Sequence, residues 1–406
     1  MGLESFREKI KELAKVALNK PSRYGSDINI YEFIPKEPPK INLYESRFSK
    51  RLEGVGIDVK ASTRSATYFQ VDSKVLAYKS FYPGVEILPL EMAIDQYRDF
   101  IRDYLWRAVP VDTDKYTAIA ELRGSGGYFI RIKRGVKVDK PIQTCLFMVG
   151  GGLQAPHNIV IAEEGSEAHL ITGCTIMPEV VGLHVGITEF YIEDRARVTY
   201  TMIHAWNKVV HVRPRTGIYL SNDSEYISYY MTLANAKSIQ TFPKIYAKGD
   251  TSRAYSSSII LALGDAEYDI GTEVVLIGQG SKGEVVSRVL AKDNSVTYAR
   301  GRIVGLGEKV KGHVECRALS LSSKACILAV PELESKSQTA ELTHEASIGK
   351  LAEDEIIYLM SKGFDEKEAE SIVIRGFMDV SIRGLLPSLE RTVKSVIDLI
   401  TRMATH

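Results

Sequence analysis

Cysteine and tryptophan are scarce in this chain of 406 residues, which has four cysteines and two tryptophans. The cysteines, Cys145, Cys174, Cys316 and Cys326, are scattered singly, so they form neither the dense framework of a disulfide-stabilised secreted domain nor a C-x-x-C pair. We therefore expect four free thiols in a reducing, cytoplasmic compartment. Each is then either a residue of the core or a ligand.

An excess of charge of either sign is also absent, because 52 Lys and Arg residues against 51 Asp and Glu residues leave a net charge of +1. Surfaces that bind nucleic acid are strongly basic, so DNA and RNA are not expected as partners. No apolar run approaches the ~18 residues needed to span a bilayer, and the first 20 residues mix charged with apolar side chains. We expect a soluble protein without a membrane segment.

The motifs of several enzyme classes are missing as well. The glycine clusters GSGG at 124–127 and GGG at 150–152 do not fit the P-loop pattern, and no G-x-S-x-G nucleophile motif is present. Five histidines are spread singly with no H-x-H or H-E-x-x-H spacing, which favours hydrogen-bonded structural residues: His157, His169, His184, His204 and His211. The sequence does not indicate a conventional enzyme.

The hydrophobic pattern divides the chain into three regions. Residues 1–114 form a mixed region with helices, since Phe6, Ile10, Leu13 and Ala17 recur at helical spacing. Residues 115–335 form a β core of short runs such as YFIRIK at 128–133, VTYTMI at 198–203 and GTEVVLIG at 271–278. So many strands exceed one ordinary sandwich, whereas a solenoid grows coil by coil. Without a strict repeat, the pattern leaves a β-helix and a large double sandwich open.

Residues 336–406 are expected to be a C-terminal helical domain. Asp365 and Glu368 have the spacing of a capping box at the start of one helix. A last helix from about Ser388 carries one continuous apolar stripe, formed by Leu389, Val393, Val396, Ile400 and Met403. Two alternatives remain for what packs against this stripe: the chain's own β core, or a partner protein that binds the helix in a groove.

Two short segments concentrate potential metal ligands. GHVEC at 312–316 and THEAS at 343–347 supply the thiol of Cys316, the imidazoles of His313 and His344, and the carboxylates of Glu315 and Glu345. Zinc, copper and the iron of iron-sulfur clusters all accept thiolate and imidazole, so the set suggests a metal without identifying it. In a strand, His313 and Glu315 face one side and Cys316 the other. By composition alone, ordinary structural residues remain the alternative.

The other cysteines carry weaker signals. Cys174, in LITGCT, lies beside a glycine where a strand is expected to meet a turn, so its thiol is either reachable or that of a small buried hydrophobe. Cys145 and Cys326 lie in the apolar runs TCLFMV and ACILAV and are predicted to be core residues.

The segment from Val314 to Phe377 resembles the SufB/SufD proteins of the SUF iron-sulfur assembly system. The shared order is a cysteine-containing strand, VPELE, THEAS, YLMSKG and RGF, and weaker similarity extends back through GCT at 173–175 and GVKVDKPIQ at 135–143. The resemblance implies a mainly β fold, a right-handed parallel β-helix core with helical segments at both ends. It also implies a scaffold protein rather than an enzyme, with ATP hydrolysis on a separate subunit.

The resemblance further implies partners and site residues. The expected partners are a SufC-like ABC-type ATPase at the C-terminal helices, a second copy or a SufB/SufD paralogue as dimer partner through the β-helix, and a cysteine desulfurase system as sulfur donor. Cys316, His344 and Glu345 would lie at the dimer interface and hold a transient iron-sulfur cluster, for which a 4Fe-4S form is one option. Cys174 would be linked to sulfur entry. The presence of Cys316 makes the chain more similar to SufB than to SufD.

Two departures from the family pattern concern the path of sulfur. His204, Ala205 and Trp206 stand where SufB proteins usually have Q-N-W, and LFMVGG at 146–151 replaces the polar residues of F-R-I-N. If those residues relay sulfur, this chain relays it differently or receives it elsewhere. Two alternatives to a cluster scaffold remain: a SufD-like structural adaptor without its own cluster, and a β-helix enzyme acting on carbohydrate.

Overall fold

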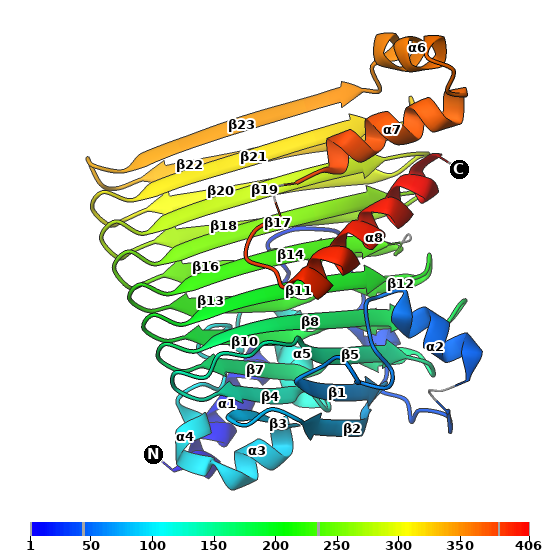
Figure 1. Ribbon diagram of the computed structural model, residues 1–406. Coiled ribbons are helices and arrows are strands. Elements are labelled where there is room, and N and C mark those ends of the chain that lie inside the picture. Colours follow the sequence, from blue (N-terminus) through cyan, green and yellow to red (C-terminus); the bar gives the residue numbers. More distant parts are fainter. Residues whose placement is uncertain (1, 43–44, 234–235, 381, 406) are drawn as a thin grey trace.

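Stacked parallel strands form the body of the protein in the computed structural model, which describes residues 2–42, 45–233, 236–380 and 382–405. Each strand pairs with the strand one coil later, so the chain winds into a parallel β-solenoid with helices at both ends (Figure 1). This confirms the expected fold class and decides against the double sandwich. The three runs expected to be strands all lie in strands.

Two sheets form the opposite walls of the solenoid, with ten and thirteen strands among the described residues. We call the ten-stranded wall the first sheet. Only its outermost pair, β1 and β2, is antiparallel. In spatial order it contains β2 (Lys74–Ser80), β1 (Ala66–Val71), β5 (Ile142–Met148), β8 (Glu167–Ile176), β11 (Arg197–Ala205), β14 (Glu225–Leu233), β17 (Arg253–Ala262), β19 (Lys282–Ala291), β21 (Lys311–Ser320) and β23 (Glu341–Lys350).

The second sheet is interrupted in its early coils and continuous in its late ones. Pro156, Pro214 and Pro243 lie at three of the interruptions, since proline has no N–H for a ladder. Its long strands are β3 (Val85–Pro89), β4 (Tyr128–Ile132), β7 (His157–Ala162), β10 (Ile187–Ile192), β13 (Arg215–Leu220), β16 (Lys244–Ala247), β18 (Glu267–Leu276), β20 (Val296–Gly305) and β22 (Cys326–Ser335). The short strands beside the interruptions are β6 (Gly152–Gln154), β9 (Gly182–His184), β12 (Val210–Val212) and β15 (Ser238–Thr241).

The turns at one edge of the solenoid stack with a shared conformation in the coils from β7 to β21. Each has one residue in the left-handed region: Gly165, Arg195, Asp223, Thr251, Gly280 and Lys309. The residue before it links neighbouring coils, because Asp194 accepts from the backbone N–H of Asn222, and Asn222 accepts from that of Asp250, each at 2.9 Å. This ladder of side chains fixes the coil length at 28 to 30 residues, although the residues themselves differ from coil to coil.

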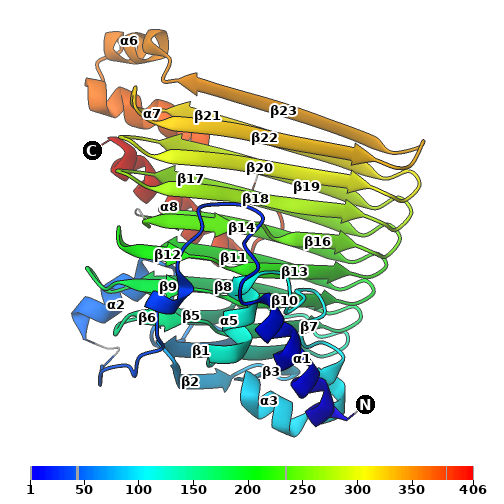
Figure 2. The same cartoon turned by 180° about the vertical axis from the view of Figure 1, so that it is seen from behind.

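Helices cover both outer faces of the solenoid. Against the second sheet pack α1 (Leu3–Ala17), α3 (Leu90–Gln96), α4 (Arg98–Arg102) and α5 (Lys115–Arg123), with a 3-10 turn at Ile30–Glu32 (Figure 2). Against the first sheet pack α2 (Ser46–Glu53), α7 (Glu366–Met378) and α8 (Pro387–Thr405). The helix α6 (Glu353–Ser361) buries none of its residues. The capping box predicted at Asp365 and Glu368 is present at the start of α7.

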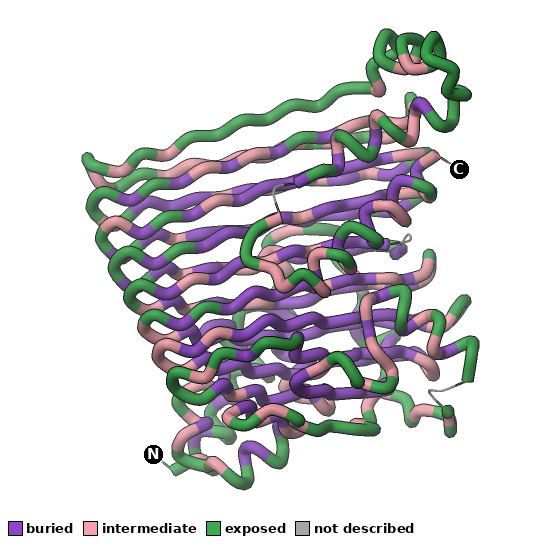
Figure 3. Tube along the Cα trace, in the orientation of Figure 1, coloured by how far each residue is buried: buried purple, intermediate pink, exposed green. Residues whose placement is uncertain are grey.

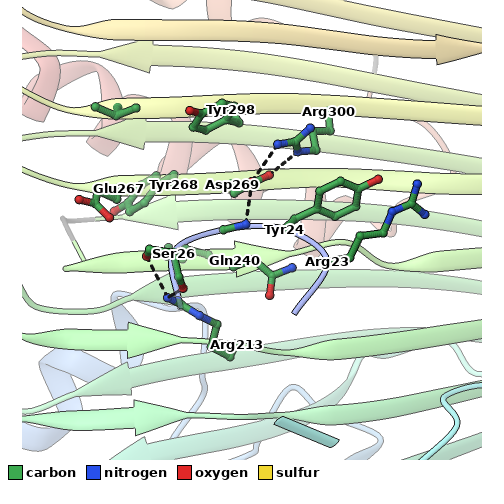
Figure 4. Close-up of a pocket in the computed structure, with 13 residues that line it drawn as sticks. Arg23, Tyr24, Ser26, Arg213, Gln240, Glu267, Tyr268, Asp269, Tyr298 and Arg300 are labelled. Carbon is green, nitrogen blue, oxygen red and sulfur yellow. Dashed lines mark hydrogen bonds and ion pairs between the residues drawn. The ribbon is translucent and has the colours of Figure 1, made fainter. Parts of the chain in front are cut away.

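An extended N-terminal arm crosses the outer face of the second sheet (Figure 4). The backbone N–H of Gly25 donates to Asp269 at 3.0 Å, and Asp269 also accepts from Arg300 at 2.6 and 3.0 Å. The guanidinium of Arg213 donates to the backbone oxygen of Ser26 at 3.1 Å. A pocket of about 470 Å³ opens beside the arm, on the opposite wall from Cys316 and therefore separate from the expected cluster ligands.

The regions differ from their expected boundaries at both ends. Strands β1 to β3 precede residue 115, so the mixed N-terminal region begins the sheets as well as covering them. Strand β23 follows residue 335, so the solenoid extends to Lys350 before the helices begin at Glu353. Among the described residues, no helix combines the length and apolar character required to cross a membrane.

Gly217 of β13 tests how closely the N-terminal region packs on the second sheet. A Cβ atom there would lie 2.2 Å from the carbonyl oxygen of Ala108, so Gly217→Ala should destabilise the fold by roughly 1–3 kcal/mol. The matched control is Gly349→Ala in β23, whose Cβ would meet only Leu319, at 3.8 Å. Thermal melts should show a lowered Tm for the first variant and an unchanged Tm for the second. Equal melting would contradict this packing.

Candidate functional site

Cys316 and Cys174 both lie inside the solenoid, on the inner face of the first sheet. Residues paired in register in a parallel ladder point to the same side, and Cys316 pairs with Ser287 before it and with Ala346 after it. Its side chain belongs to the core between the sheets and is 1% exposed. Burial, and next the charge of Glu315, raises the pKa of the Cys316 thiol to about 11. The resting group is therefore a thiol, and a metal would have to displace its proton.

His344 shares this inner face but is open to solvent. It pairs with Val314, a core residue, so its imidazole points toward the same interior as Cys316 and lies two positions along the ladder. Strand β23 has no following strand among the described residues, so almost all of it is exposed (Figure 3). The end of the solenoid thus presents an exposed histidine beside a thiol that lies one coil deeper.

Glu345 does not join Cys316 and His344 within one chain. It pairs with Glu315 on the outer face, where Arg317 donates to it at 3.0 Å and also lies 2.8 Å from Glu315. Neighbouring residues of a strand face opposite sides, so His344 and Glu345 point to different faces of the sheet, and Glu345 does not lie beside the thiol. Within the described part of the chain, no three His, Cys, Asp or Glu side chains gather closely enough to hold a metal ion.

Cys174 lies within β8, two residues before its last residue Ile176, rather than in a turn. It is 0% exposed, so the expectation of a reachable thiol at a turn is wrong, and burial raises its pKa well above the usual value. Gly173 suggested a turn, but it continues the strand. Glycine is needed there because a Cβ would lie 2.6 Å from the side chain of Ile57, which packs closely on the sheet. Cys145 is buried as predicted, whereas Cys326 is exposed, because it begins the edge strand β22.

Cys316 belongs to a column of residues that stack in register along the inner face. The hydroxyl oxygens of Ser258 and Ser287 lie 2.8 Å apart, and Ser287 is the direct neighbour of Cys316. A cavity of about 40 Å³ adjoins this column, which contains Thr172, Met202, Tyr230, Ser258, Ser287 and Cys316. Sequence reasoning missed it, although its spacing of 28 to 30 residues was the available signal.

A buried cluster of imidazoles connects Cys174 to the same column. His204 follows Cys174 in register, and its Nδ1 lies 3.0 Å from the hydroxyl of Tyr230. Burial, and then neighbouring His184, lowers the pKa of His204 well below its usual value, while burial lowers that of His184 to about 3. Both are neutral near pH 7. Nε2 of His204 and Nε1 of Trp206 have no hydrogen-bond partner in the described part of the chain.

The C-terminal helices divide between a covered and an uncovered surface. The stripe on α8 packs on the chain's own first sheet, since Leu389, Val393 and Ile400 are at most 1% exposed. The apolar residues without a cover lie instead on α6 and at its end, where Ile357 is 64%, Tyr358 61% and Phe364 42% exposed. Figure 1 shows α6 at the corner of the molecule, beyond both sheets.

The part of the chain that contains Cys174, Cys316 and His344 matches a known protein family. Residues 147–377 match the sequence profile of the SufBD core domain, described as SUF system FeS cluster assembly. A SufBD family protein of iron-sulfur cluster assembly from Methanothermobacter thermautotrophicus is 42% identical, over 97% of this chain and 98% of the relative. A SufBD family protein from Archaeoglobus fulgidus is 41% identical, over 87% of this chain and 95% of the relative. One from Pyrococcus horikoshii is 33% identical, over 91% of this chain and 84% of the relative.

The chain belongs to the SufBD family. It is therefore a component of iron-sulfur cluster assembly in the SUF system, a family whose members typically do not catalyse a reaction themselves. This SufBD protein has a buried thiol, Cys316, and an exposed imidazole, His344, on one face at one end of the solenoid.

Alkylation of the native protein tests the burial of the thiols. Iodoacetamide at pH 8 should modify Cys326 and leave Cys145, Cys174 and Cys316 unmodified, because only Cys326 is exposed. Peptide mass spectrometry would give the extent at each site, and denaturation should make all four reactive. If Cys174 reacted as fast as Cys326 in the native protein, its thiol would be reachable and the core position assigned to it would be wrong.

Proposed function

We propose that this SufBD protein is a scaffold that builds a labile iron-sulfur cluster where two solenoid ends meet. The observation that carries the proposal is that buried Cys316 and exposed His344 share the inner face of the last two strands of the first sheet, β21 and β23. Thiolate and imidazole are both ligands of cluster iron. One chain supplies two such groups on its inner face, and a second chain would supply the remainder.

The uncovered end of the solenoid supports a dimer as the working form. An edge strand presents unpaired backbone groups, and β23 also leaves the inner-face side chain of Ile348 50% exposed. A second copy or a SufB/SufD paralogue would cover this end and form an isologous or pseudo-symmetric interface. Glu345 would contribute an oxygen ligand or accept a proton only after its hydrogen bond to Arg317 breaks. We therefore assign it a smaller role than Cys316 and His344.

The inner column supports a route for sulfur within the scaffold. In this proposal a persulfide of a desulfurase system transfers its outer sulfur to the thiol of Cys174 and leaves as a thiol, and the polar side chains of Tyr230, Ser258 and Ser287 line the inner face between there and Cys316. The imidazole of His204 lies beside Cys174 in register and would accept the thiol proton only once water reaches both groups, because burial disfavours both of their charged forms. Because Cys174 is enclosed, sulfur transfer would require a local opening of the coil.

Replacing the two ligands tests the cluster site. Cys316→Ala should remove most of the cluster absorbance after anaerobic reconstitution, and His344→Ala should lower it, since each change deletes an iron ligand. Iron and sulfide assays would quantify the loss, and circular dichroism should stay close to that of the wild type. Normal yield in both variants would refute the site, and a wild-type protein without bound iron and sulfide would indicate a SufD-like adaptor.

Mixing the two variants tests whether the ligands come from both chains. A heterodimer of Cys316→Ala and His344→Ala chains keeps one complete cross-chain pair, while each homodimer keeps none. Random exchange makes half of the dimers heterodimers, so about a quarter of the wild-type signal should return. Proven exchange without any recovery would rule out ligation across the interface.

The exposed surface of α6 is the expected contact for a SufC-like ATPase. Ile357→Glu should weaken binding by at least about tenfold, because it places a charge in an apolar contact, and should leave the Tm unchanged, because the side chain is 64% exposed. The control is Val16→Glu in α1, 83% exposed and at the other end of the molecule. Equal binding by both variants would contradict the assignment. Deleting residues 351–406 is a poorer test, because α8 covers the first sheet.

A further inference from the structure

A buried histidine and a buried glutamate form a pair on the second sheet, far from the cluster ligands. Nε2 of His157 in β7 lies 2.8 Å from Oε2 of Glu189 in the neighbouring strand β10, two residues beyond Ile187, the register partner of His157. Glu189 is 0% exposed and His157 is 8% exposed. Neither residue has a part in the cluster site proposed above, which lies at the opposite end of the solenoid.

The surroundings of Glu189 determine which imidazole nitrogen carries hydrogen. The backbone N–H groups of Trp106, Ala108 and Val109 donate to its carboxylate at 2.8, 2.7 and 3.1 Å. In each of these contacts the carboxylate is the acceptor. His157 therefore donates to it from Nε2, which leaves Nδ1 for a hydrogen bond to another group.

His157 lines a pocket, and its Nδ1 has no hydrogen-bond partner in the described part of the chain. The pocket has a volume of about 350 Å³ and lies between α1, α3, α5 and the edge of the second sheet. Trp106 has a φ of 55°, a rare conformation for a bulky residue, and its indole lies 4.3 Å from the imidazole, between ring centroids. Strain of this kind often accompanies binding sites.

The walls of the pocket combine apolar side chains with unpaired charges. Apolar walls come from residues such as Phe6 and Leu105. Arg7 and Lys11 of α1 line it without an ion pair among the described residues, and Glu91 lines it with the opposite charge. Glu121, the remaining carboxylate, accepts from the indole N–H of Trp106 at 2.9 Å. Two free cations against one free carboxylate favour an anionic ligand over a metal cation.

We propose that this pocket binds a small amphipathic organic anion, whose hydroxyl or similar donor hydrogen-bonds to Nδ1 of His157. Glu189 positions the imidazole and fixes its tautomer, as a carboxylate does for a histidine that must accept a proton. Arg7 and Lys11 meet the anionic group, and the apolar walls take the body of the ligand.

A matched pair of probes tests the hydrogen bond to Nδ1. In the full-length protein, 3-(4-hydroxyphenyl)propanoate should bind about three- to tenfold more tightly than 3-phenylpropanoate, which lacks only the hydroxyl. His157→Gln should abolish that preference, because the amide still donates to Glu189 but has no basic nitrogen. Isothermal titration calorimetry would give the affinities, and thermal melting would establish that the variant is folded.

Charge variants at the mouth provide a second test that does not depend on changing a buried residue. Arg7→Gln and Lys11→Gln should weaken both acids and leave their ratio unchanged, whereas Glu91→Gln should strengthen both. The uncharged 3-(4-hydroxyphenyl)propanamide should bind more weakly than the acid. Equal affinities for the two acids, a preference that persists in His157→Gln, or no binding at millimolar concentration would each overturn the proposal. These outcomes are independent of cluster yield, so the two proposals fail separately.

Discussion

The register between coils is the constraint on which the structure depends. Every coil of the first sheet repeats after 28 to 30 residues, and side chains in register point the same way. Stacked left-handed residues and the hydrogen-bonded ladder through Asp194, Asn222 and Asp250 hold that length at the turns. A single inserted residue would turn the following side chains of a strand to the other face. The inner column from Tyr230 to Cys316 exists only because the register is maintained.

Stacking also explains why a buried thiol and an exposed imidazole lie close together at the end of the solenoid. In the interior each coil is covered on both sides, so Cys174, His204 and Ser287 are fully or almost fully buried. The last coil has a neighbour on one side only, and the same inward direction that buries Val314 leaves His344 exposed. An end of this kind joins a protected thiol to an accessible ligand, which is a suitable arrangement for a cluster that must be assembled and then released.

Sequence alone predicted the architecture better than the positions of single side chains. Strand runs, helical stripes and the Asp365 capping box depend on local patterns, and the family motifs from Val314 to Phe377 identified the solenoid. The environments of Cys174 and Cys326 depend on which coil lies beside them, and local patterns do not contain that information. Single histidines favour a structural reading of His157, because a local pattern does not contain its partner Glu189, which is 32 residues away. The family resemblance groups Glu345 with His344, although alternation in a strand separates their side chains.

We propose that the exposed end around β23 is completed by another solenoid end. Sedimentation velocity at micromolar concentrations tests it most directly, with the wild type compared with Ile348→Asp, which puts a charge on the inner face of the uncovered strand. We expect the wild type to sediment as a species of twice the 45.2 kDa chain mass. The variant should be monomeric, with an unchanged melting temperature. A monomeric wild type, or a variant that remains dimeric, would contradict it.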